Sequence, residues 1–558
     1  MSVSLAPSPA QPSPAGAQVT WTAEASSPGA TWYRFRVRRA EGEYRMIRDY
    51  GPVNTLEWAP LSEGSYEMEV WARNFDTGES AAASVTYEVA PRAAGAPVIS
   101  ATAHPMVWLY SAPACTAGGR IRVSLEGQDG ATQYTPWQPC AAGLTFNQYL
   151  AGMRAAGTYR VRHEVDAGSG AVNGPYLNLR VPDVAIPVPD FKVAQPPQPP
   201  VPQGVLLQSV LFTNPLATDL NGNPVWFYPQ PLTFLTRANP GGTFWGILED
   251  FFSDPSGQVV REFDLAGNTV RETNAARINE QLAARGLRLI GSFHHEALSL
   301  PDGGVLVLAS SEQAVEDLQG PGRVNVIGDT IIALDRDMQV VWVWDCFDHL
   351  DLSRTALLGE TCTPGAGGCP PFYNSERAND WLHSNSLALT PDGNILISVR
   401  HLDQLLKVDY ANGRGSGRVL WALGKGGDFT LRGAPEDAWF SHQHDANYIS
   451  HSRIAVFDNG NMRQAEDENV HSRGQVWEID ERTRTAFPVL NADLGGYCLA
   501  LGSAQRLPNG NYHYNCGWLP GNLSRSSEVS PSGATAYSID FAILSYRTVR
   551  MRDMYTPE

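Results

Sequence analysis

DWLHSNSLALTPDGNILISVR, residues 380–400, carries the clearest secondary-structure signal in this chain. Its two apolar segments flank Pro-Asp-Gly, a strong short-range signal for a tight turn, so the stretch predicts a β-hairpin. GSFHHEALSLPDGG (residues 291–304) and GSAQRLPNGN (residues 502–511) carry a Pro-Asp-Gly or Pro-Asn-Gly turn at the same place, and FSHQHDANYI (residues 440–449) repeats the histidines ahead of a strand. Histidines that recur at one place in a repeated β unit predict side chains that converge on one axis.

A longer repeat surrounds these stretches. Its unit is an acidic residue or a turn, then glycine, then an apolar or aromatic strand, and six copies span about 350 residues. Strand-rich repeats of this length are typical of β-propeller blades. The copies begin at Asp219, Phe263, Leu334, Val408, Ile479 and Val529. Their uneven spacing predicts long loops between blades, notably residues 345–380, and such loops often build a functional site.

The N-terminal part contains a two-fold repeat. EGSYEMEVWARN (residues 63–74) matches AGTYRVRHEVDAG (residues 156–168), and both alternate with the period of a half-buried strand. The Gly-x-Tyr entry is similar to the tyrosine corner of immunoglobulin and fibronectin III sandwiches.

The predicted fold class is therefore all-β, with two Ig/fibronectin III-like sandwich modules followed by a six-bladed β-propeller. The one convincing amphipathic helix pattern is short and covers residues 275–284. The predicted division is a disordered segment 1–14, sandwiches 15–92 and 93–181, a proline-rich linker 182–203 and a propeller domain 204–558.

Composition excludes several classes of partner. The net charge is −17 and the pI about 5.2, so a nucleic-acid partner is not expected, because phosphate contacts need a basic surface. No apolar run reaches the roughly 18 residues that span a bilayer, so no transmembrane segment is expected. The first residues do not have the pattern of a signal peptide. An anionic substrate would have to be held by local positive groups.

Seven cysteines favour an oxidising compartment. The spacing offers the pairs Cys115–Cys140, Cys362–Cys369 and Cys498–Cys516, with Cys346 left over, but pairing cannot be read from a sequence. A periplasmic or secreted location is expected, and a cytoplasmic one stays open.

Five motifs in order resemble the bacterial arylsulfotransferase family (aryl-sulfate sulfotransferase, ASST). They are WLHSNSLALTPDGNILISVR, VLWALGKGGDF, FSHQHDANYI, IAVFDNGNMR and GSAQRLPNGN, and the resemblance covers roughly residues 204–551. It implies a six-bladed propeller that moves a sulfuryl group from an aryl sulfate donor to a phenolic acceptor. It also implies a sulfo-histidine intermediate, ping-pong turnover, and no need for phosphoadenosine phosphosulfate or another cofactor.

The resemblance also implies roles for individual residues. His444 matches the family's nucleophile, His383 and Asn385 match its sulfate-binding pair, and Arg400 matches its sulfate-clamping arginine. The remaining catalytic histidine is His295, with His294 open as the alternative, because the doubled histidine leaves the register uncertain by one. Strand parity favours His295. Ser503 is a further candidate for substrate binding. His442 and the N-terminal sandwiches depart from the family pattern.

Elementary chemistry agrees with these roles. Sulfuryl transfer spreads charge over equatorial oxygens, which an arginine fork and imidazole donors stabilise. A nucleophilic histidine must be neutral, which its ordinary pKa of about 6.5 allows at neutral pH. Two alternatives remain open: a non-catalytic ligand- or protein-binding propeller, and a metal-dependent hydrolase that uses the same histidines, although no familiar metal-ligand spacing is present. The sequence leaves the natural substrates and a homo-oligomer undecided.

Overall fold

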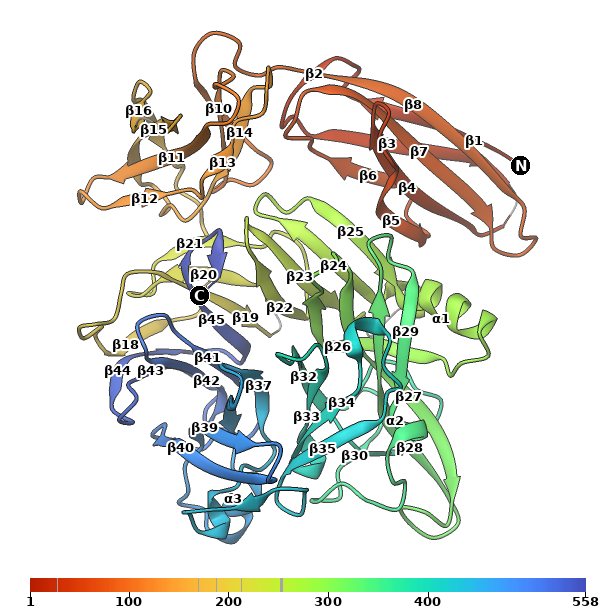
Figure 1. Ribbon diagram of the computed structural model, residues 1–558. Helices are drawn as coiled ribbons and strands as arrows, with labels where there is room; N and C mark the ends of the chain where they lie inside the picture. Colours follow the sequence, from red (N-terminus) through yellow and green to blue (C-terminus); the bar gives the residue numbers. More distant parts are fainter. Residues whose placement is uncertain (28, 169, 187, 212, 251–253, 558) are drawn as a thin grey trace.

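The computed structural model describes residues 1–27, 29–168, 170–186, 188–211, 213–250 and 254–557, and nearly all of their regular structure is β-strand (Figure 1). The all-β class is thus confirmed. The amphipathic segment expected as a helix is α1 (Ala275–Ala284). Two shorter helices, α2 (Cys346–His349) and α3 (Asn461–Glu466), lie in loops. The short 3-10 helices are η1 (Pro255–Gly257), η2 (Arg400–Leu402), η3 (Ala411–Gly413) and η4 (Glu436–Ala438). No helix in the described ranges is long and apolar enough to cross a membrane.

The first N-terminal module consists of two sheets that pack against each other around Trp21, Phe35 and Met68. The strand orders are β1-β3-β6 and β2-β8-β7-β4-β5. The Tyr66 hydroxyl donates to the Ser62 carbonyl at 2.8 Å, which is the corner contact expected from the Gly-x-Tyr pattern. The strands are β1 (Ser2–Ser8), β2 (Ser13–Pro14), β3 (Val19–Ser26), β4 (Thr31–Arg39), β5 (Arg45–Gly51), β6 (Thr55–Trp58), β7 (Gly64–Asn74) and β8 (Ser80–Ala90).

The first fourteen residues differ from the expected disorder. Strand β1 pairs antiparallel with β3 along its whole length, from Ser2 opposite Ser26 to Ser8 opposite Thr20. Leu5 is buried in the core of the module. Backbone pairing and this burial together offset the entropy lost on ordering the segment, which its proline- and serine-rich composition does not reveal.

The second N-terminal module repeats the two-sheet arrangement, with strand order β14-β10-β9 in one sheet and β11 and β15 at the centre of the other. The disulfide Cys115–Cys140 lies beside its core. The proline-rich segment that follows contributes strand β18, which pairs with β44 at the edge of a later sheet. The strands are β9 (Val98–Ala101), β10 (Trp108–Ala112), β11 (Arg120–Gly127), β12 (Thr132–Tyr134), β13 (Gln138–Pro139), β14 (Phe146–Leu150), β15 (Thr158–Asp166), β16 (Ala171–Asn173), β17 (Leu177–Arg180) and β18 (Phe191–Gln195).

The rest of the chain forms successive antiparallel sheets, each built mainly from consecutive strands. The orders are β21-β20-β19-β45-β46, β22-β23-β24-β25, β26-β27-β28-β29, β32-β33-β34-β35, β37-β38-β39-β40 with β36 at its edge, and β41-β42-β43-β44 with β18 at its edge. In addition, β28 pairs with β31, which pairs with β30.

The strands of the first three of these sheets are β19 (Val205–Val210), β20 (Leu216–Asp219), β21 (Pro224–Phe227), β22 (Phe234–Asn239), β23 (Thr243–Leu248), β24 (Val259–Asp264), β25 (Thr269–Asn274), β26 (Ile290–Ser299), β27 (Val305–Glu316), β28 (Arg323–Leu334), β29 (Val340–Asp345), β30 (Thr361–Cys362), β31 (Ala378–Asp380), β45 (Ser545–Asp553) and β46 (Thr556–Pro557). Those of the last three are β32 (Ser384–Leu389), β33 (Ile395–Val399), β34 (Gln404–Val408), β35 (Val419–Gly424), β36 (Thr430–Leu431), β37 (His444–Tyr448), β38 (Arg453–Asp458), β39 (Arg473–Asp480), β40 (Thr485–Asp493), β41 (Ser503–Arg506), β42 (Tyr512–Leu519), β43 (Leu523–Val529) and β44 (Thr535–Phe541).

One strand of each sheet contacts one strand of the next sheet: the first strand in five of the sheets, and β45 in the sheet that contains β19. Strand β22 contacts β26, which contacts β32; the order continues through β37 and β41 to β45, and β45 contacts β22 again. Apolar cores fill the space between neighbouring sheets, with Trp344 and Trp381 in one and Trp421 and Trp477 in the next. Figure 1 shows these sheets below the two N-terminal modules. Side chains at the ends of the six strands are therefore brought near one another.

The first module is joined to this assembly by strand pairing. Strand β5 runs parallel to β25, with Arg48 opposite Glu272, and a salt bridge of 2.9 Å joins the two side chains. One continuous sheet thus extends from the first module into the sheet that contains β22.

Candidate active site

Three of the predicted site histidines lie at irregular points of neighbouring first strands. His295 lies within β26, His383 directly precedes β32, and His444 is the first residue of β37. The backbone φ is +55° at His295 and +49° at His383, a region that non-glycine residues rarely occupy. Strand pairing shifts register at all three places. Such bulges re-aim side chains and are common next to functional sites.

The imidazole rings form a continuous row. Ring centroids are 5.2 Å apart for His295 and His383, 4.8 Å for His383 and His401, and 5.7 Å for His401 and His442. His444 lies close enough to His383 and His295 to affect their electrostatics. Residues more than 140 positions apart in the chain are thus brought together, as the recurring histidines predicted.

His444 is buried and held at both ring nitrogens. Nδ1 lies 2.7 Å from Oδ1 of Asn459, and Nε2 accepts a hydrogen bond from the Leu501 backbone N–H at 3.2 Å. Burial lowers the pKa of His444 well below its ordinary value, and the positive charge of Arg400 lowers it further. His444 is therefore a neutral imidazole at neutral pH.

His383 has a different partner. Its Nδ1 lies 2.7 Å from a carboxylate oxygen of Asp380, which holds the ring and leaves Nε2 for other contacts. The carboxylate fixes the orientation of the ring. The pair is suited to accept a proton from a hydroxyl group.

Of the doubled histidines, His295 is the one whose ring contacts His383. Its pKa is held well below the ordinary value, first by burial and then by the neighbouring His294 and His383. The ring of His294 points elsewhere: Nε2 lies 3.3 Å from Asp329, and Nδ1 lies 2.9 Å from Nδ1 of His295. This geometry agrees with the parity argument for His295.

Arg400 lies at the start of η2, beside the row of histidines. Its Nη1 donates to Nε2 of His401 at 2.5 Å, whereas its Nε is buried and without a hydrogen-bond partner among the described residues. Burial lowers the pKa of Arg400, although Glu360 and Asp380 oppose the shift, and an arginine this basic stays charged. A buried guanidinium N–H with no partner is a donor available to an anion.

Asn385 and Ser503 are engaged with the protein itself. The Asn385 amide is fully buried, donates to the Gln443 carbonyl at 2.7 Å and accepts from the Asp445 N–H at 3.4 Å. The Ser503 hydroxyl donates to the Thr548 carbonyl at 2.8 Å. These contacts join strands, and direct contact of Asn385 and Ser503 with the substrate stays a prediction.

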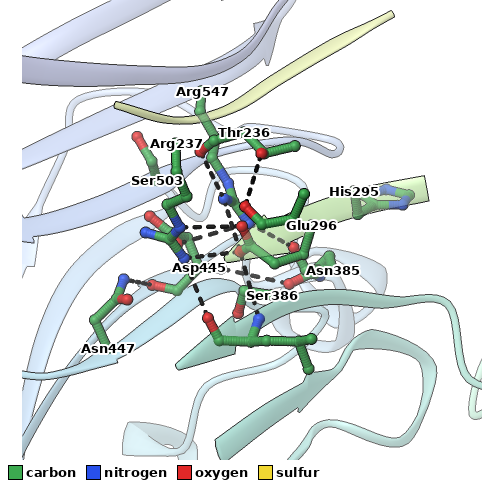
Figure 2. A network of polar contacts seen from close by, with 12 residues as sticks. Thr236, Arg237, His295, Glu296, Asn385, Ser386, Asp445, Asn447, Ser503 and Arg547 are labelled. Carbon is green, nitrogen blue, oxygen red and sulfur yellow. Dashed lines mark hydrogen bonds and ion pairs between the residues drawn. The ribbon is translucent and has the colours of Figure 1, made fainter. Parts of the chain in front are cut away.

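Behind these residues lies a buried network of four charges, shown in Figure 2. Glu296 accepts from Arg237 at 2.7 Å and from Arg547 at 2.9 Å, and Asp445 lies 3.4 Å from Arg237. Arg547 also donates to the Asn385 carbonyl at 2.7 Å. His295 extends away from this network in Figure 2. The network therefore ties the inner strands together without occupying the histidine row.

Sequence reasoning missed several residues of the site. Neither His401 nor Asn459 was singled out from the sequence, but the first stacks on His383 and the second holds His444. Glu360, from the long loop, binds Nε2 of His442 at 2.6 Å, and Asp403 binds its Nδ1 at 2.9 Å. The proximity of Asp380 to His383 in the sequence was an available signal. The other contacts join segments that are far apart in the sequence, so no local pattern indicates them.

Asp380, His383 and His401 offer three potential metal-ligand atoms within 4.8 Å of one another. Nδ1 of His401, however, donates to the Asp380 carbonyl at 2.7 Å, which places its lone pair on Nε2, where Arg400 donates. Both ring nitrogens of His401 are then engaged, so only Asp380 and His383 could offer free ligand atoms to a common point. The arrangement does not fit a metal centre, which needs three or four converging ligands.

Comparison with known proteins identifies relatives of this region. The sequence profile of the family described as Arylsulfotransferase (ASST) matches residues 190–542. An arylsulfate sulfotransferase AssT of Escherichia coli O6:H1 is 27% identical over 324 residues, which cover 49% of this chain and 51% of that protein. The AssT of Lelliottia amnigena is 26% identical over 297 residues, covering 45% and 46%. The chain spans about half the length of these curated relatives.

Two solved structures match a smaller part of the chain. A segment of two fibronectin type-III domains from chicken tenascin is 12% identical, covers 32% of this chain and 97% of its own, and has a TM-score of 0.16. The FN1–FN3 domains of chicken CNTN1 are 11% identical, cover 31% and 65%, and have a TM-score of 0.14. Scores this low carry no weight for the fold.

Proposed function

Because the chain belongs to the arylsulfotransferase family, we propose that it transfers a sulfuryl group from a phenolic sulfate ester to a phenol. The transfer proceeds through a sulfo-histidine and without phosphoadenosine phosphosulfate. One observation carries the proposal: His295, His383 and the neutral His444 meet beside Arg400, whose buried Nε has no partner among the described residues.

In the first half-reaction, the lone pair of His444 attacks the sulfur of the aryl sulfate. A nitrogen–sulfur bond forms, the bond between sulfur and the aryl oxygen breaks, and the aryl oxygen leaves with the electron pair as a phenolate. Arg400 holds the equatorial oxygens, whose charge is spread in the transition state. A phenolate is a good leaving group, so little acid assistance is needed, and His295 is placed to supply a hydrogen bond.

In the second half-reaction, His383 accepts the proton of the incoming phenol. Asp380 on Nδ1 supports this role because its charge stabilises the imidazolium that forms. The phenol oxygen bonds to sulfur, the nitrogen–sulfur bond breaks, and His444 regains its lone pair. Two easier steps replace one difficult step, which is the usual gain of covalent catalysis.

Around this centre, Asn385 and Ser503 act by positioning strands, since their polar atoms bind the backbone. His294 orients Nδ1 of His295 and is itself anchored by Asp329. Burial would raise the pKa of Asp329, but His294 and Ser384 outweigh it and lower that pKa, so the carboxylate is charged.

We assign residues 204–558 to a six-bladed β-propeller, with Ig/fibronectin III-like modules at 15–92 and 93–181 and a linker at 182–203. The return of the strand contacts from β45 to β22 supports the propeller, because it places the last sheet beside the first. Strand β45, from the C-terminal end, completes the sheet of β19 to β21.

A periplasmic or secreted location fits the cysteines. Disulfides join Cys115–Cys140, Cys362–Cys369 and Cys498–Cys516, and Cys346 is free and buried. Disulfides persist in oxidising compartments.

The test is mass spectrometry after brief exposure of the protein to a chromogenic aryl sulfate without acceptor. We expect one sulfuryl group on the peptide that contains His444, and phenol-dependent release of it when an acceptor is added. His444→Asn should abolish the adduct and reduce transfer on the order of 10³-fold or more. His451→Asn, at an exposed loop position, is the matched control and should behave as the unmodified protein.

Other results would favour the other classes. Sulfate release without acceptor that stops with a chelator would indicate a metal-dependent hydrolase. No turnover of any aryl sulfate would indicate a binding propeller. Full activity of His444→Asn would overturn the assignment of the nucleophile.

A further inference from the structure

Asn459 follows the end of β38, the strand that pairs with β37, so its side chain lies next to His444. The Asn459 side chain is fully buried. Its Nδ2 donates to the carbonyls of Cys498 and Leu501, each at 3.1 Å. Because both amide hydrogens go to backbone carbonyls, the amide can have only one orientation, with Oδ1 facing Nδ1 of His444 at 2.7 Å.

Two independent contacts then fix the proton on His444. An amide oxygen only accepts, so Nδ1 of His444 must donate and carry the hydrogen. On the other side of the ring, the Leu501 backbone N–H only donates, and it faces Nε2 at 3.2 Å. Both contacts are satisfied by the same tautomer of the neutral imidazole, which has its lone pair on Nε2.

We propose that Asn459 is a positioning residue that holds His444 as the neutral Nδ1–H tautomer, so that the lone pair lies on Nε2. In this structure that lone pair accepts the Leu501 N–H, and it attacks the donor sulfur once that hydrogen bond is released. This inference rests on the proposed function and adds a residue that was not singled out from the sequence.

The choice of an amide, rather than a carboxylate, has a chemical reason. His383 has the carboxylate of Asp380 on its Nδ1, which suits a ring that takes up a proton in the proposed acceptor step. A protonated nucleophile would have no lone pair. The hydrogen bond to the neutral amide of Asn459 orients His444 and raises its pKa, but burial and Arg400 outweigh this effect, and a full negative charge would raise the pKa more. The hydrogen-bond partner of each ring thus matches its proposed role, His444 as the nucleophile and His383 as the base.

The charges around His444 act in the same direction. Arg400, His383 and Arg547 each disfavour a proton on His444, and His295 is a fourth neighbouring titratable group. The neighbouring carboxylate of Asp445 is engaged elsewhere, with Arg547, Arg237 and the Ala504 N–H. Among the described residues, no carboxylate bonds directly to His444. An aspartate at position 459 would therefore place a negative charge next to a ring that has none bonded to it.

The support of Asn459 is itself fixed. The Ser472 hydroxyl donates to the Asn459 carbonyl at 2.8 Å and accepts from the Cys498 N–H at 2.8 Å. Cys498 is disulfide-bonded to Cys516 in β42. The segment from Cys498 to Leu501 therefore supplies both acceptors of the amide and the N–H at Nε2 from one anchored loop.

The test compares Asn459→Asp and Asn459→Ala with the unmodified protein in the donor half-reaction, measured as the rate of adduct formation against pH. For Asn459→Asp we expect the acidic limb of the profile to move to higher pH by about one unit or more, with the rate recovered on the alkaline side. For Asn459→Ala we expect a loss of about 10- to 100-fold at every pH without that displacement. Asn461→Asp is the matched control, since this buried amide binds the same loop through Leu499 and does not contact His444.

A second readout does not depend on activity. In protein labelled with ¹⁵N-histidine, the signal that disappears in His444→Asn should have an unprotonated Nε2 and a protonated Nδ1, and Asn459→Ala should weaken this preference. A proton on Nε2 in the unmodified protein, or superimposable pH profiles for Asn459→Asp and the unmodified protein, would overturn the inference. If no sulfuryl adduct forms at all, the proposed function fails. The tautomer measurement still shows whether Asn459 sets the tautomer of His444.

Discussion

At the scale of single residues, the site is organised by what each imidazole binds with its second nitrogen. His444 has an amide, His383 has a carboxylate, and His442 has a carboxylate at both nitrogens. The pKa of His444 is lowered and that of His442 is raised, because burial, hydrogen-bond partners and nearby charge set the pKa of each ring. Burial contributes by lowering the pKa of His444 and His295, whose partners do not compensate for it.

The role of Asp380 predicts a selective effect on the acceptor half-reaction. Asp380→Asn should slow transfer to the phenol by about 10²-fold or more, most for weakly acidic phenols, because the base loses its charged partner. Formation of the sulfo-histidine from the donor should change much less. Single-turnover measurements of the two half-reactions separate these effects.

The matched control is Asp493→Asn, which alters the exposed pair of Asp493 and His471 at 2.8 Å. It should leave both half-reactions unchanged. Equal losses in the two half-reactions of Asp380→Asn would contradict a base-specific role.

His442 predicts a pH dependence of stability. Burial would lower its pKa and Arg400 opposes the charge, but Asp403 and Glu360 outweigh them and raise the pKa of His442. The folded state thus keeps a proton that the unfolded chain loses near its ordinary pKa of about 6.5, so this stability is present below that pH and is lost as pH rises through the raised value. His442→Gln should therefore reduce the free energy of unfolding more at about pH 5.5 than at about pH 9.

His513→Gln is a control of opposite sign. Burial lowers the pKa of His513 to about 3, so it is neutral in the folded state and loses stability as pH falls below about 6.5. The cost of this substitution should shrink toward low pH, whereas that of His442→Gln should grow. Urea denaturation at the two pH values measures both, and parallel trends for the two variants would refute the assignment of His442.

At the scale of elements, the site depends on irregular strand ends and on loops tied by disulfides. Regular pairing would direct alternate side chains to opposite faces, whereas the bulges at His295 and His444 break that alternation. The segment Cys498–Leu501 carries no side chain of the histidine row, yet its backbone holds Asn459 and faces Nε2 of His444.

This predicts a functional effect of removing one disulfide. The double variant Cys498→Ala/Cys516→Ala should slow adduct formation by about 10-fold, because the loop that positions Asn459 is released. Cys115→Ala/Cys140→Ala removes a disulfide from the second N-terminal module and is the control. It should lower thermal stability without slowing adduct formation. Equal rates for the two variants would argue against a positioning role of the loop.

At the scale of the whole molecule, six sheets must keep their inner strands in register around a small centre. The charges of Arg237, Glu296, Asp445 and Arg547 join strands β22, β26, β37 and β45 there, and Arg547 and Glu296 are almost fully buried. Strand β45 is the last long strand of the chain and pairs with β19, so it brings sequence ends that are more than 300 residues apart into one sheet.

The network predicts a large loss of stability when one member is removed. Arg547→Met should lower the free energy of unfolding by about 3–5 kcal/mol, because Glu296 is left buried with one fewer charged partner. Arg525→Met breaks a partly exposed pair with Asp540 and should cost about 1 kcal/mol or less. Thermal or denaturant unfolding of the two variants tests the difference, and similar small losses would show that the centre does not depend on these charges.

Much of the fold was accessible from local sequence. The Pro-Asp-Gly and Pro-Asn-Gly turns form as predicted: the N–H groups of Gly303, Gly393 and Gly510 each donate at 3.0 Å to the carbonyl three residues earlier. Helix α1 has the predicted bounds. These features depend on side chains a few residues apart, which a sequence displays directly. The strand at residues 2–8 was missed because its stability comes from pairing with β3 and burial of Leu5.

The sequence by itself determined which chemical groups this protein can bring to a site, and that they come from repeated strand units, because turn residues and alternation are local properties. Tertiary structure alone decided which ring nitrogen carries a proton, which polar groups are left for a ligand, and which are used up by the backbone. Asn459 and Ser503 show the difference: one became part of the site and the other a strand contact, through partners about 40 positions away. Those outcomes depend on hydrogen bonds and burial between distant segments, which exist only once the chain has folded.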